Sequence, residues 1–245
     1  MFLFLKKAGG IVIKIYPAEE RYSGNHGWLQ CNFSFSFADY YDPSNLQFGP
    51  LRVFNDDYIQ PLKGFGIHPH RDMEIVTFVL KGQLKHEDNT GGSEVLKPGE
   101  VQRMSAGTGI LHSEMNSSTD EVTNSLQLWF HPSEKGIAPS YEQKKYDQMA
   151  TKNQLLPVVS NRIKSEDIAY IHQDLTIYMS DLDTDKNLTF KQEDSRKIYV
   201  FVIEGKLFLN EKYQLKRRDA ARITDLTRLD LSSQEGASFM LIDLP

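Results

Sequence analysis

The sequence of 245 residues contains a single cysteine, Cys31. One thiol cannot build a disulfide framework within the chain or a cysteine-rich zinc site, which indicates a reducing compartment. Basic residues number 28 against 33 acidic ones, and the formal net charge is −5. This balance argues against a protein that holds nucleic acid through bulk charge. With thiols and basic surfaces set aside, the seven histidines become the residues to examine.

Long apolar runs are also missing. The apolar start Met1–Leu5 is cut short by Lys6 and Lys7, whereas a secretory signal needs roughly 7–15 apolar residues after a basic start. No stretch approaches the roughly 20 apolar residues of a membrane span. We therefore expect a soluble, cytoplasmic protein that contacts neither membranes nor nucleic acid directly.

Short segments typical of β-strands dominate the chain. Residues 33–37 and 125–130 alternate between apolar and polar side chains, and residues 74–80 and 197–203 are rich in β-branched and aromatic residues. Gly, Pro and Asn turns separate such segments, a pattern that predicts an all-β sandwich or barrel. Only the polar stretch 140–154 predicts a short helix. Further strands are predicted at residues 11–15, 51–54, 175–179 and 238–244.

Two parts of the chain resemble each other. Residues 78–84 align with residues 201–207 and share Phe, Val, Gly and Leu at matching places, and residues 96–104 align with residues 215–223. The offset falls from 123 to 119 between the two alignments, as expected if one hairpin is four residues shorter. Internal similarity of this kind indicates a duplicated unit, here two small β-barrels in one chain.

The spacing of polar residues points to a metal site. His68 and His70 are two residues apart, as are His112 and Glu114. Side chains two apart on a strand share a face, with Cα atoms about 6.5–7 Å apart, so facing strands could direct three nitrogens and one oxygen at one ion. Open positions on such an ion suit catalysis, although a His-X-His pair also arises by chance at a surface. The other four histidines are not expected to be ligands: His26, His86, His131 and His172.

Longer motifs around these pairs resemble the pirin family of the cupin superfamily. They are Asp39–Pro43, Leu51–Asp56, Gly66–Glu74 and Arg103–Glu114, and the closing Leu241–Pro245 resembles bacterial members. The likeness covers most of the chain. It implies an all-β bicupin, with two tandem cupin barrels of the jelly-roll type and a few short helices.

The pirin resemblance implies different chemistry in the two cupins. It places a metal-binding cupin in residues 1–135 and a cupin without metal ligands in residues 136–245. The internal alignment supports this difference, because none of the four residues aligned with the histidine and glutamate pairs repeats the set: Lys191, Glu193, Leu231 and Ser233.

The resemblance also implies one divalent transition metal, held by His68, His70, His112 and Glu114. Fe(II) is the expected ion and Ni, Mn, Cu, Co and Zn are alternatives, because the donor set suits all of them. Glu114 is in addition the expected catalytic residue, since a carboxylate beside a metal can take a proton. Glu74 is expected to be a hydrogen-bond partner of a ligand.

Bacterial pirins are linked to quercetin 2,3-dioxygenase activity, so we expect a metal-dependent quercetinase that cleaves a flavonol-like aromatic with O₂. The alternative is a non-catalytic, iron- or redox-sensing regulator that binds a protein partner, as the animal pirins do. A metal used only for stability is a third reading. A monomer is expected. Phe33 stands where many pirin-like chains have a histidine, which leaves the substrate open.

Overall fold

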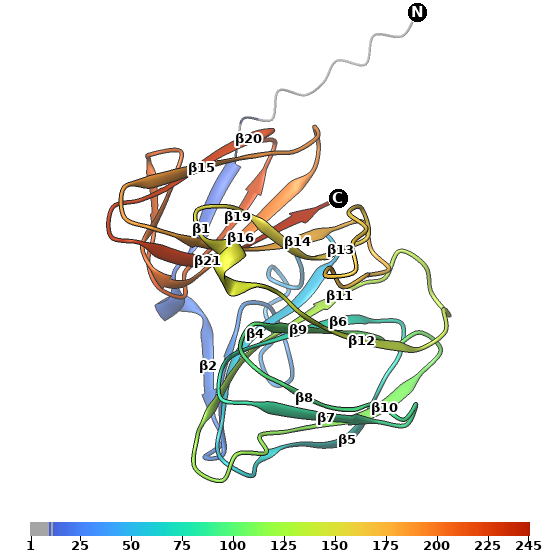
Figure 1. Cartoon of the computed structure of the whole chain (residues 1–245). Helices are drawn as coiled ribbons and strands as arrows, with labels where there is room; N and C mark the ends of the chain where they lie inside the picture. Colours follow the sequence, from blue (N-terminus) through green and yellow to red (C-terminus); the bar gives the residue numbers. More distant parts are fainter. Residues whose placement is uncertain (1–9, 11) are drawn as a thin grey trace, which may run out of the picture.

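The structure, a computed structural model, describes residue 10 and residues 12–245 (Figure 1). The apolar start Met1–Leu5 and the first residue of the predicted strand 11–15 lie outside the described residues. Apart from strands, the described part contains two short 3-10 helices, η1 (Ala18–Glu20) and η2 (Gln148–Thr151). The predicted all-β class with a few short helices is confirmed. None of the helices in the described part is long and apolar enough to cross a membrane.

The N-terminal half consists of a seven-stranded sheet and a four-stranded sheet. The large sheet has the order β12-β9-β6-β11-β4-β3-β2, with β2 (Tyr22–Asn25), β3 (Leu29–Phe33), β4 (Leu51–Ile59), β6 (Glu74–Lys81), β9 (Glu100–Ser105), β11 (Thr123–Phe130) and β12 (Ser140–Lys145). The small sheet has the order β5-β10-β7-β8, with β5 (Gly64–His70), β7 (Leu84–Asp88), β8 (Ser93–Leu96) and β10 (Ile110–Met115).

The C-terminal half repeats this plan with a six-stranded and a four-stranded sheet. The large sheet has the order β1-β19-β16-β21-β14-β13, with β1 (Val12–Tyr16), β13 (Leu156–Ser160), β14 (Thr176–Leu182), β16 (Lys197–Gly205), β19 (Ala220–Thr224) and β21 (Ala237–Leu244). The small sheet has the order β15-β20-β17-β18, with β15 (Lys186–Lys191), β17 (Leu207–Leu209), β18 (Tyr213–Leu215) and β20 (Arg228–Ser233).

The two halves have matching strand orders, as the similarity within the sequence predicts. The aligned segments 78–84 and 201–207 begin in β6 and β16, and the second pair of segments ends in β9 and β19. The edge strands, however, are exchanged: β1 pairs with β19 of the C-terminal half, and β12 pairs with β9 of the N-terminal half. In Figure 1 the blue β1 accordingly lies among the orange and red strands. The division between residues 135 and 136 stays a prediction.

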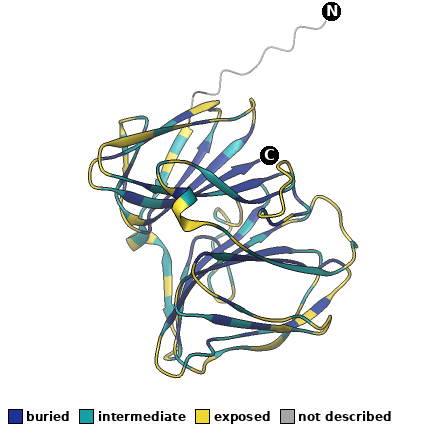
Figure 2. Ribbon diagram, viewed as in Figure 1, coloured by how far each residue is buried: buried dark blue, intermediate teal, exposed yellow. Residues whose placement is uncertain are grey.

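The main hydrophobic core lies between the two large sheets. Phe54 and Phe130 of the N-terminal half belong to the same buried cluster as Tyr199 and Phe201 of the C-terminal half. The Phe54 ring centroid lies 5.2 Å from that of Tyr199 and 4.6 Å from that of Phe201. Strands such as β6 and β16 are therefore buried on both faces, as the dark blue ribbons of Figure 2 show. This explains their nearly continuous apolar sequences.

Two local predictions differ from the structure. Of the predicted strand 33–37 only Phe33 lies in a strand, because β3 ends there. The alternation does not mark one buried face, since Ser34 and Ser36 are buried as well. Phe35 packs into the core between the halves, whereas Phe33 and Phe37 belong to the interior cluster of the N-terminal half. The stretch 140–154, predicted to hold a short helix, does contain the 3-10 helix η2, but it begins with strand β12, which was not predicted.

The interior of the C-terminal half is filled with apolar side chains. Leu231 is fully buried in a cluster with Val200, Val202 and Phe239. Strand register pairs Leu231 with Leu188 and Leu229 with Phe190, as it pairs His112 with His68 and Ile110 with His70. The counterparts of the histidine pair are thus Leu188 and Phe190, three residues before the predicted Lys191 and Glu193. Neither counterpart is a metal ligand.

Candidate metal centre

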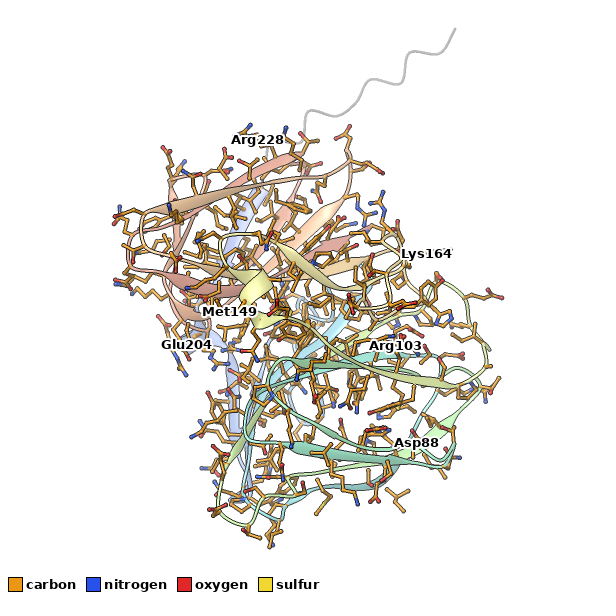
Figure 3. All side chains as sticks on the ribbon, viewed as in Figure 1. Asp88, Arg103, Met149, Lys164, Glu204 and Arg228 are labelled. Carbon is orange, nitrogen blue, oxygen red and sulfur yellow. The ribbon has the colours of Figure 1, made fainter. Side chains whose placement is uncertain are left out.

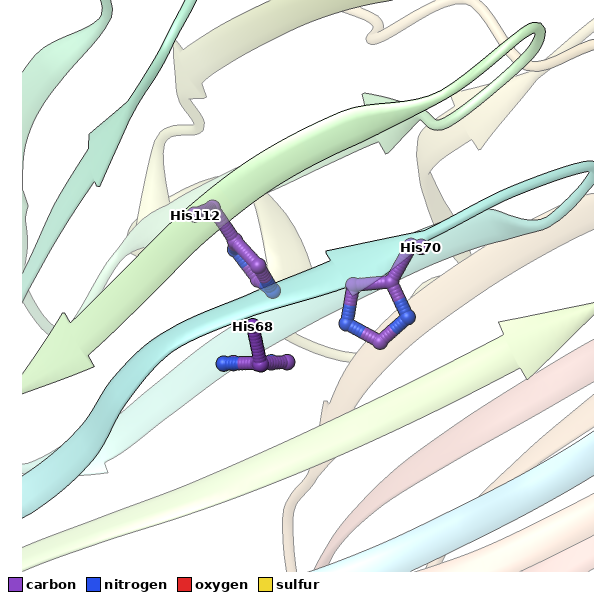
Figure 4. A group of neighbouring side chains, drawn as sticks. All are labelled: His68, His70 and His112. Atoms are coloured by element: carbon purple, nitrogen blue, oxygen red, sulfur yellow. The ribbon is translucent and has the colours of Figure 1, made fainter.

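Strands β5 and β10 bring the predicted histidines together. In their antiparallel register His112 lies opposite His68, and Ile110 lies opposite His70. His68 and His70 are two apart on β5, so both rings extend from the same face. Figure 4 shows the three rings from these two neighbouring strands converging on one place.

The separations of the three rings suit one metal ion. Their candidate ligand atoms all lie within 4.8 Å of one another. The ring centroids of His68 and His112 are 4.4 Å apart, and each is 4.8 Å from that of His70. An ion bound by imidazoles at about 2.1 Å needs ligand nitrogens separated by less than twice that length, so a small closure of the rings completes the geometry.

Hydrogen bonds direct the free nitrogens inward. His68 Nδ1 lies 2.7 Å from the carbonyl oxygen of Gly66. Because a carbonyl only accepts, Nδ1 donates and the lone pair of His68 Nε2 is free for an ion. His112 Nε2 is buried and has no hydrogen-bond partner, which is rare for a buried polar atom. A metal ion would satisfy it, so the three histidines fit a divalent transition metal.

Burial keeps two of these rings neutral. It lowers the pKa of His70 from 6.5 to about 4 and, more strongly, the pKa of His112 from 6.5 to about 2. The neighbouring His68 adds to both shifts in pKa. Since a metal binds the unprotonated imidazole, His70 and His112 are ready to act as ligands at neutral pH without losing a proton.

These shifts predict that acid destabilises the metal-free protein. As the pH falls below 6.5, the histidines of the unfolded chain take up protons, whereas His70 and His112 in the folded chain stay neutral down to about 4 and about 2. The free energy of unfolding should therefore decrease between about pH 6.5 and pH 4. Urea unfolding of metal-free protein at several pH values measures this decrease.

Two variants separate the contribution of these histidines to the pH dependence of stability from that of other titrating groups. The double variant His70→Gln, His112→Gln should lose stability less steeply as the pH falls. A variant of the exposed His26, His26→Gln, should keep the slope of the unchanged protein. Equal slopes for the double variant and the unchanged protein would contradict the prediction.

Glu114 lies on β10 beside the histidines, after an irregularity in the pairing with β5. It is buried, and both carboxylate oxygens accept hydrogen bonds from Gln127 Nε2, at 2.9 and 2.8 Å. Burial raises the pKa of Glu114, and the Gln127 hydrogen bonds act against that rise. Glu114 forms a second group of potential ligands with His86 and His112. The histidine triad is thus brought together, while the four-residue ligand set stays a prediction.

An aromatic cavity of about 430 Å³ adjoins the site. Its size lies within the range of small-molecule pockets, roughly 300–1,000 Å³. Gln127 joins the cavity wall to Glu114, because its side-chain oxygen accepts a hydrogen bond from Trp129 Nε1 at 3.0 Å. His68 and Glu114 line the cavity together with residues that are mostly aromatic or polar: Trp28, Leu29, Phe33, Phe37, Asn55, Asp57, Gly64, Phe65, Gly66, Gln127 and Trp129.

Glu74 does not serve as predicted. Its carboxylate accepts a hydrogen bond from the Ser105 hydroxyl at 2.9 Å and another from the backbone N–H of His172 at 3.1 Å. No hydrogen bond joins it to any of the three histidines within the described residues. Glu74 therefore ties the N-terminal half to the segment that carries His172, and it is not a partner of a ligand.

Sequence reasoning missed three neighbours of the site. Gln127 and Asp57 come to the cavity through the pairing of β11 and β4, which spacing in the sequence does not reveal. His86 is fully buried next to His112. The sequence does contain a sign that His86 belongs near the site, because His86 and Asp88 are two residues apart, like the residues of the predicted pairs. Both groups of potential ligands found in the described residues lie in the N-terminal half.

Comparison with known proteins agrees with this arrangement. The Pirin family model matches residues 17–130, and the model of the quercetinase C-terminal cupin domain matches residues 158–244. The chain is 38% identical over 234 residues to a quercetin 2,3-dioxygenase of Escherichia coli K12, covering 96% of this chain and 99% of the relative.

Solved structures extend the comparison. The crystal structure of the bacterial pirin YhhW of Escherichia coli in complex with nickel(II) has a TM-score of 0.90 and 38% identity, with 96% of this chain and 99% of that chain covered. A quercetin 2,3-dioxygenase of Acinetobacter baumannii has a TM-score of 0.73 at 21% identity, covering 94% and 85% of the two chains, and shows the likeness of fold alone.

Two halves of matching strand order, with convergent histidines in the first and an apolar interior in the second, define a bicupin with one candidate metal centre. The two family models and the 38% identity over nearly the whole chain show which family of bicupins this is: the protein belongs to the pirin family.

Proposed function

We propose that the protein is a metal-dependent dioxygenase of the quercetin 2,3-dioxygenase type, acting on a flavonol-like aromatic with O₂. The observation that carries the proposal is the position of the three histidines next to an aromatic cavity of about 430 Å³. The names of the relatives favour this function over the regulatory alternative. A monomeric state and a cytoplasmic location belong to the same proposal.

The proposed ligands are His68, His70, His112 and Glu114. A divalent ion bound there would supply Lewis-acid chemistry toward a substrate hydroxyl and O₂. Fe(II) remains the first expectation, and the nickel(II) complex of the Escherichia coli pirin makes Ni(II) the best-supported alternative. Fe(II), Ni(II) and the other divalent transition metals accept imidazole and carboxylate ligands, so three histidines and a glutamate do not select among these ions.

The residues around the ligands would bind and orient the substrate. Trp129 and Phe65 would offer aromatic surfaces for a flat ring system, and Phe33 would add to this apolar part of the cavity wall. Glu114 would accept the hydroxyl proton of the substrate at a carboxylate oxygen. Gln127 holds both oxygens of that carboxylate and thereby sets the direction from which the proton arrives.

Purified protein is expected to consume O₂ and release carbon monoxide when quercetin is added. Separate samples loaded with Fe(II), Ni(II), Mn(II), Cu(II), Co(II) or Zn(II) are compared with metal-free protein, and O₂ uptake, carbon monoxide and quercetin absorbance are followed. Activity should require the metal. Metal-replete samples that consume no O₂ with any flavonol would overturn the proposal, and pull-downs with reduced and oxidised iron would then test the regulatory alternative.

A further inference from the structure

Behind His112, on the side away from His68 and His70, lie two further buried polar residues. Strand β7 flanks β10 opposite to β5, and its register places Asp88 across from His112 and His86 across from Glu114. Asp88 is labelled in Figure 3, in the N-terminal half. The side chains of His86 and Asp88 are both 0% exposed. Neither residue is among the proposed ligands.

Two hydrogen bonds join these residues to His112 in a line. His86 Nε2 lies 2.9 Å from Asp88 Oδ2. His86 Nδ1 lies 3.3 Å from His112 Nδ1. The line ends at His112 Nε2, the buried atom without a partner that belongs to the group of three histidines.

Asp88, at the end of the line farthest from the metal site, is kept in its ionised form. Asp88 Oδ1 accepts hydrogen bonds from the backbone N–H and the hydroxyl of Thr90, at 2.8 and 2.6 Å, and from the N–H of Gly92 at 3.1 Å. Burial alone would raise the pKa of Asp88, but hydrogen bonds from Thr90 and His86 lower it to about 2. Asp88 can therefore only accept from His86.

The direction of the remaining hydrogen bonds follows step by step. Because Asp88 accepts, His86 Nε2 carries a hydrogen. A neutral imidazole has one N–H, so His86 Nδ1 is an acceptor and His112 Nδ1 must carry the hydrogen between the two rings. The lone pair of His112 then lies on Nε2, toward His68 and His70. Tyr141 stacks on His86 with ring centroids 4.7 Å apart and limits its rotation.

We propose that Asp88 and His86 form a positioning relay that fixes His112 in the Nδ1–H form and presents its Nε2 to the metal. Partners of this kind set the orientation and basicity of a ligating histidine. Here the histidine ligand is two hydrogen bonds away from its carboxylate, with a second imidazole between them. The inference rests on the metal site of the proposed function but not on its substrate.

The tautomer of His112 tests the relay directly. Histidine-labelled, metal-free protein is studied by long-range ¹H–¹⁵N correlation spectroscopy, with the His112 signals assigned through a His112→Gln variant. We expect His112 to carry its hydrogen on Nδ1 and His86 to carry its hydrogen on Nε2. A hydrogen on His112 Nε2, or a doubly protonated His86 at neutral pH, would overturn the relay.

Nickel(II) titration of metal-free protein by calorimetry gives the second readout. His86→Phe keeps a ring but removes the acceptor, and we expect it to weaken nickel(II) binding by about 10- to 100-fold. His86→Gln, whose side-chain oxygen can accept from His112, should restore part of the affinity. His26→Phe, at an exposed position, should bind within about twofold of the unchanged protein.

The outcomes separate the relay from the proposed function. Unchanged nickel(II) affinity in a folded His86→Phe variant, with folding checked by circular dichroism, would overturn the relay alone. If the unchanged protein does not bind nickel(II) or Fe(II), the proposed function fails, and the spectrum of the metal-free protein still decides whether the relay exists. If His86→Phe does not fold, His86→Gln and the spectrum decide.

Discussion

Replacing His112 with alanine is expected to remove the bound metal and to reduce the proposed oxygenase activity by about 1,000-fold or more. His112 lies at the centre of the site: it belongs to both groups of potential ligands, and its Nε2 is the buried atom without a partner. A bound ion contributes several kcal/mol to transition-state stabilisation, and each loss of about 1.36 kcal/mol reduces the rate tenfold. Elemental analysis and O₂ uptake with quercetin measure the two effects.

The same variant should remain folded. His112→Ala removes a buried ring that burial keeps neutral, so the metal-free variant should also be less sensitive to acid than the metal-free unchanged protein. His26→Ala is the control, since His26 is exposed and should keep both metal and activity. A His112→Ala protein that retains the metal content of the unchanged protein would contradict the proposed ligand set.

Much of the fold was predictable because its signals are local. The alternating segment 125–130 predicted β11, the segment 51–54 predicted part of β4, and β-branched and aromatic segments predicted β6 and β16. The exchange of β1 and β12 was not predictable in this way. Both strands form edges, and which sheet an edge strand joins depends on contacts between residues far apart in the sequence, such as Ile15 with Ala221.

The histidine triad was predictable for a similar reason. Spacings of two placed His68 with His70 and His112 with Glu114 on shared faces, and only the pairing of β5 with β10 had to be assumed. The equivalents in the second half were placed wrongly, at Lys191 and not at Leu188. Strand register gives an offset of 120 between His68 and Leu188, whereas the aligned segments 78–84 and 201–207 have an offset of 123. The second half therefore has three additional residues before its aligned segment, and an alignment that starts at that segment does not show them.

The residues around the triad could not be predicted from the sequence, because the register between strands brings them together. Across the inner face of the large N-terminal sheet, adjacent strands place Asn55, Gln127, Thr77, Gln102 and Gln143 in one row. Each lies on a different strand, so no segment of the sequence shows the row. It makes the interior of this cupin polar opposite the histidines, whereas the equivalent interior of the second cupin is apolar.

This contrast suggests a division of roles between the cupins. Buried polar groups contribute less to stability than close-packed apolar ones, and a cavity of about 430 Å³ removes packing contacts from the first cupin. The apolar interior of the second cupin and the core between the halves, built around residues such as Phe54 and Phe201, compensate for this. The second cupin thus has the larger share of apolar packing, while the first one contains the histidine triad.

The pairing of β5 with β10 is the structural condition for the site, and two glycines of β5 test it. A Cβ atom at Gly64 would lie 2.1 Å from the carbonyl oxygen of Glu114 and 2.7 Å from the Cα atom of Met115, whereas one at Gly66 would meet nothing within 4 Å. Neither glycine has a positive φ, so both positions accept alanine as far as backbone conformation is concerned. The substitutions therefore differ only in what the new methyl group meets.

Gly64→Ala is expected to push β5 away from β10, because backbone atoms cannot yield as the end of a flexible side chain can. The strain should destabilise the protein by about 3 kcal/mol. It should also weaken nickel(II) binding by about 100-fold or more, since His68 and His70 move with β5 while His112 stays on β10. Gly66→Ala should change stability by no more than about 0.5 kcal/mol and leave metal binding intact. Urea unfolding and calorimetric titration measure both effects, and equal nickel(II) affinities for the two variants would show that the strand pairing does not hold the site together.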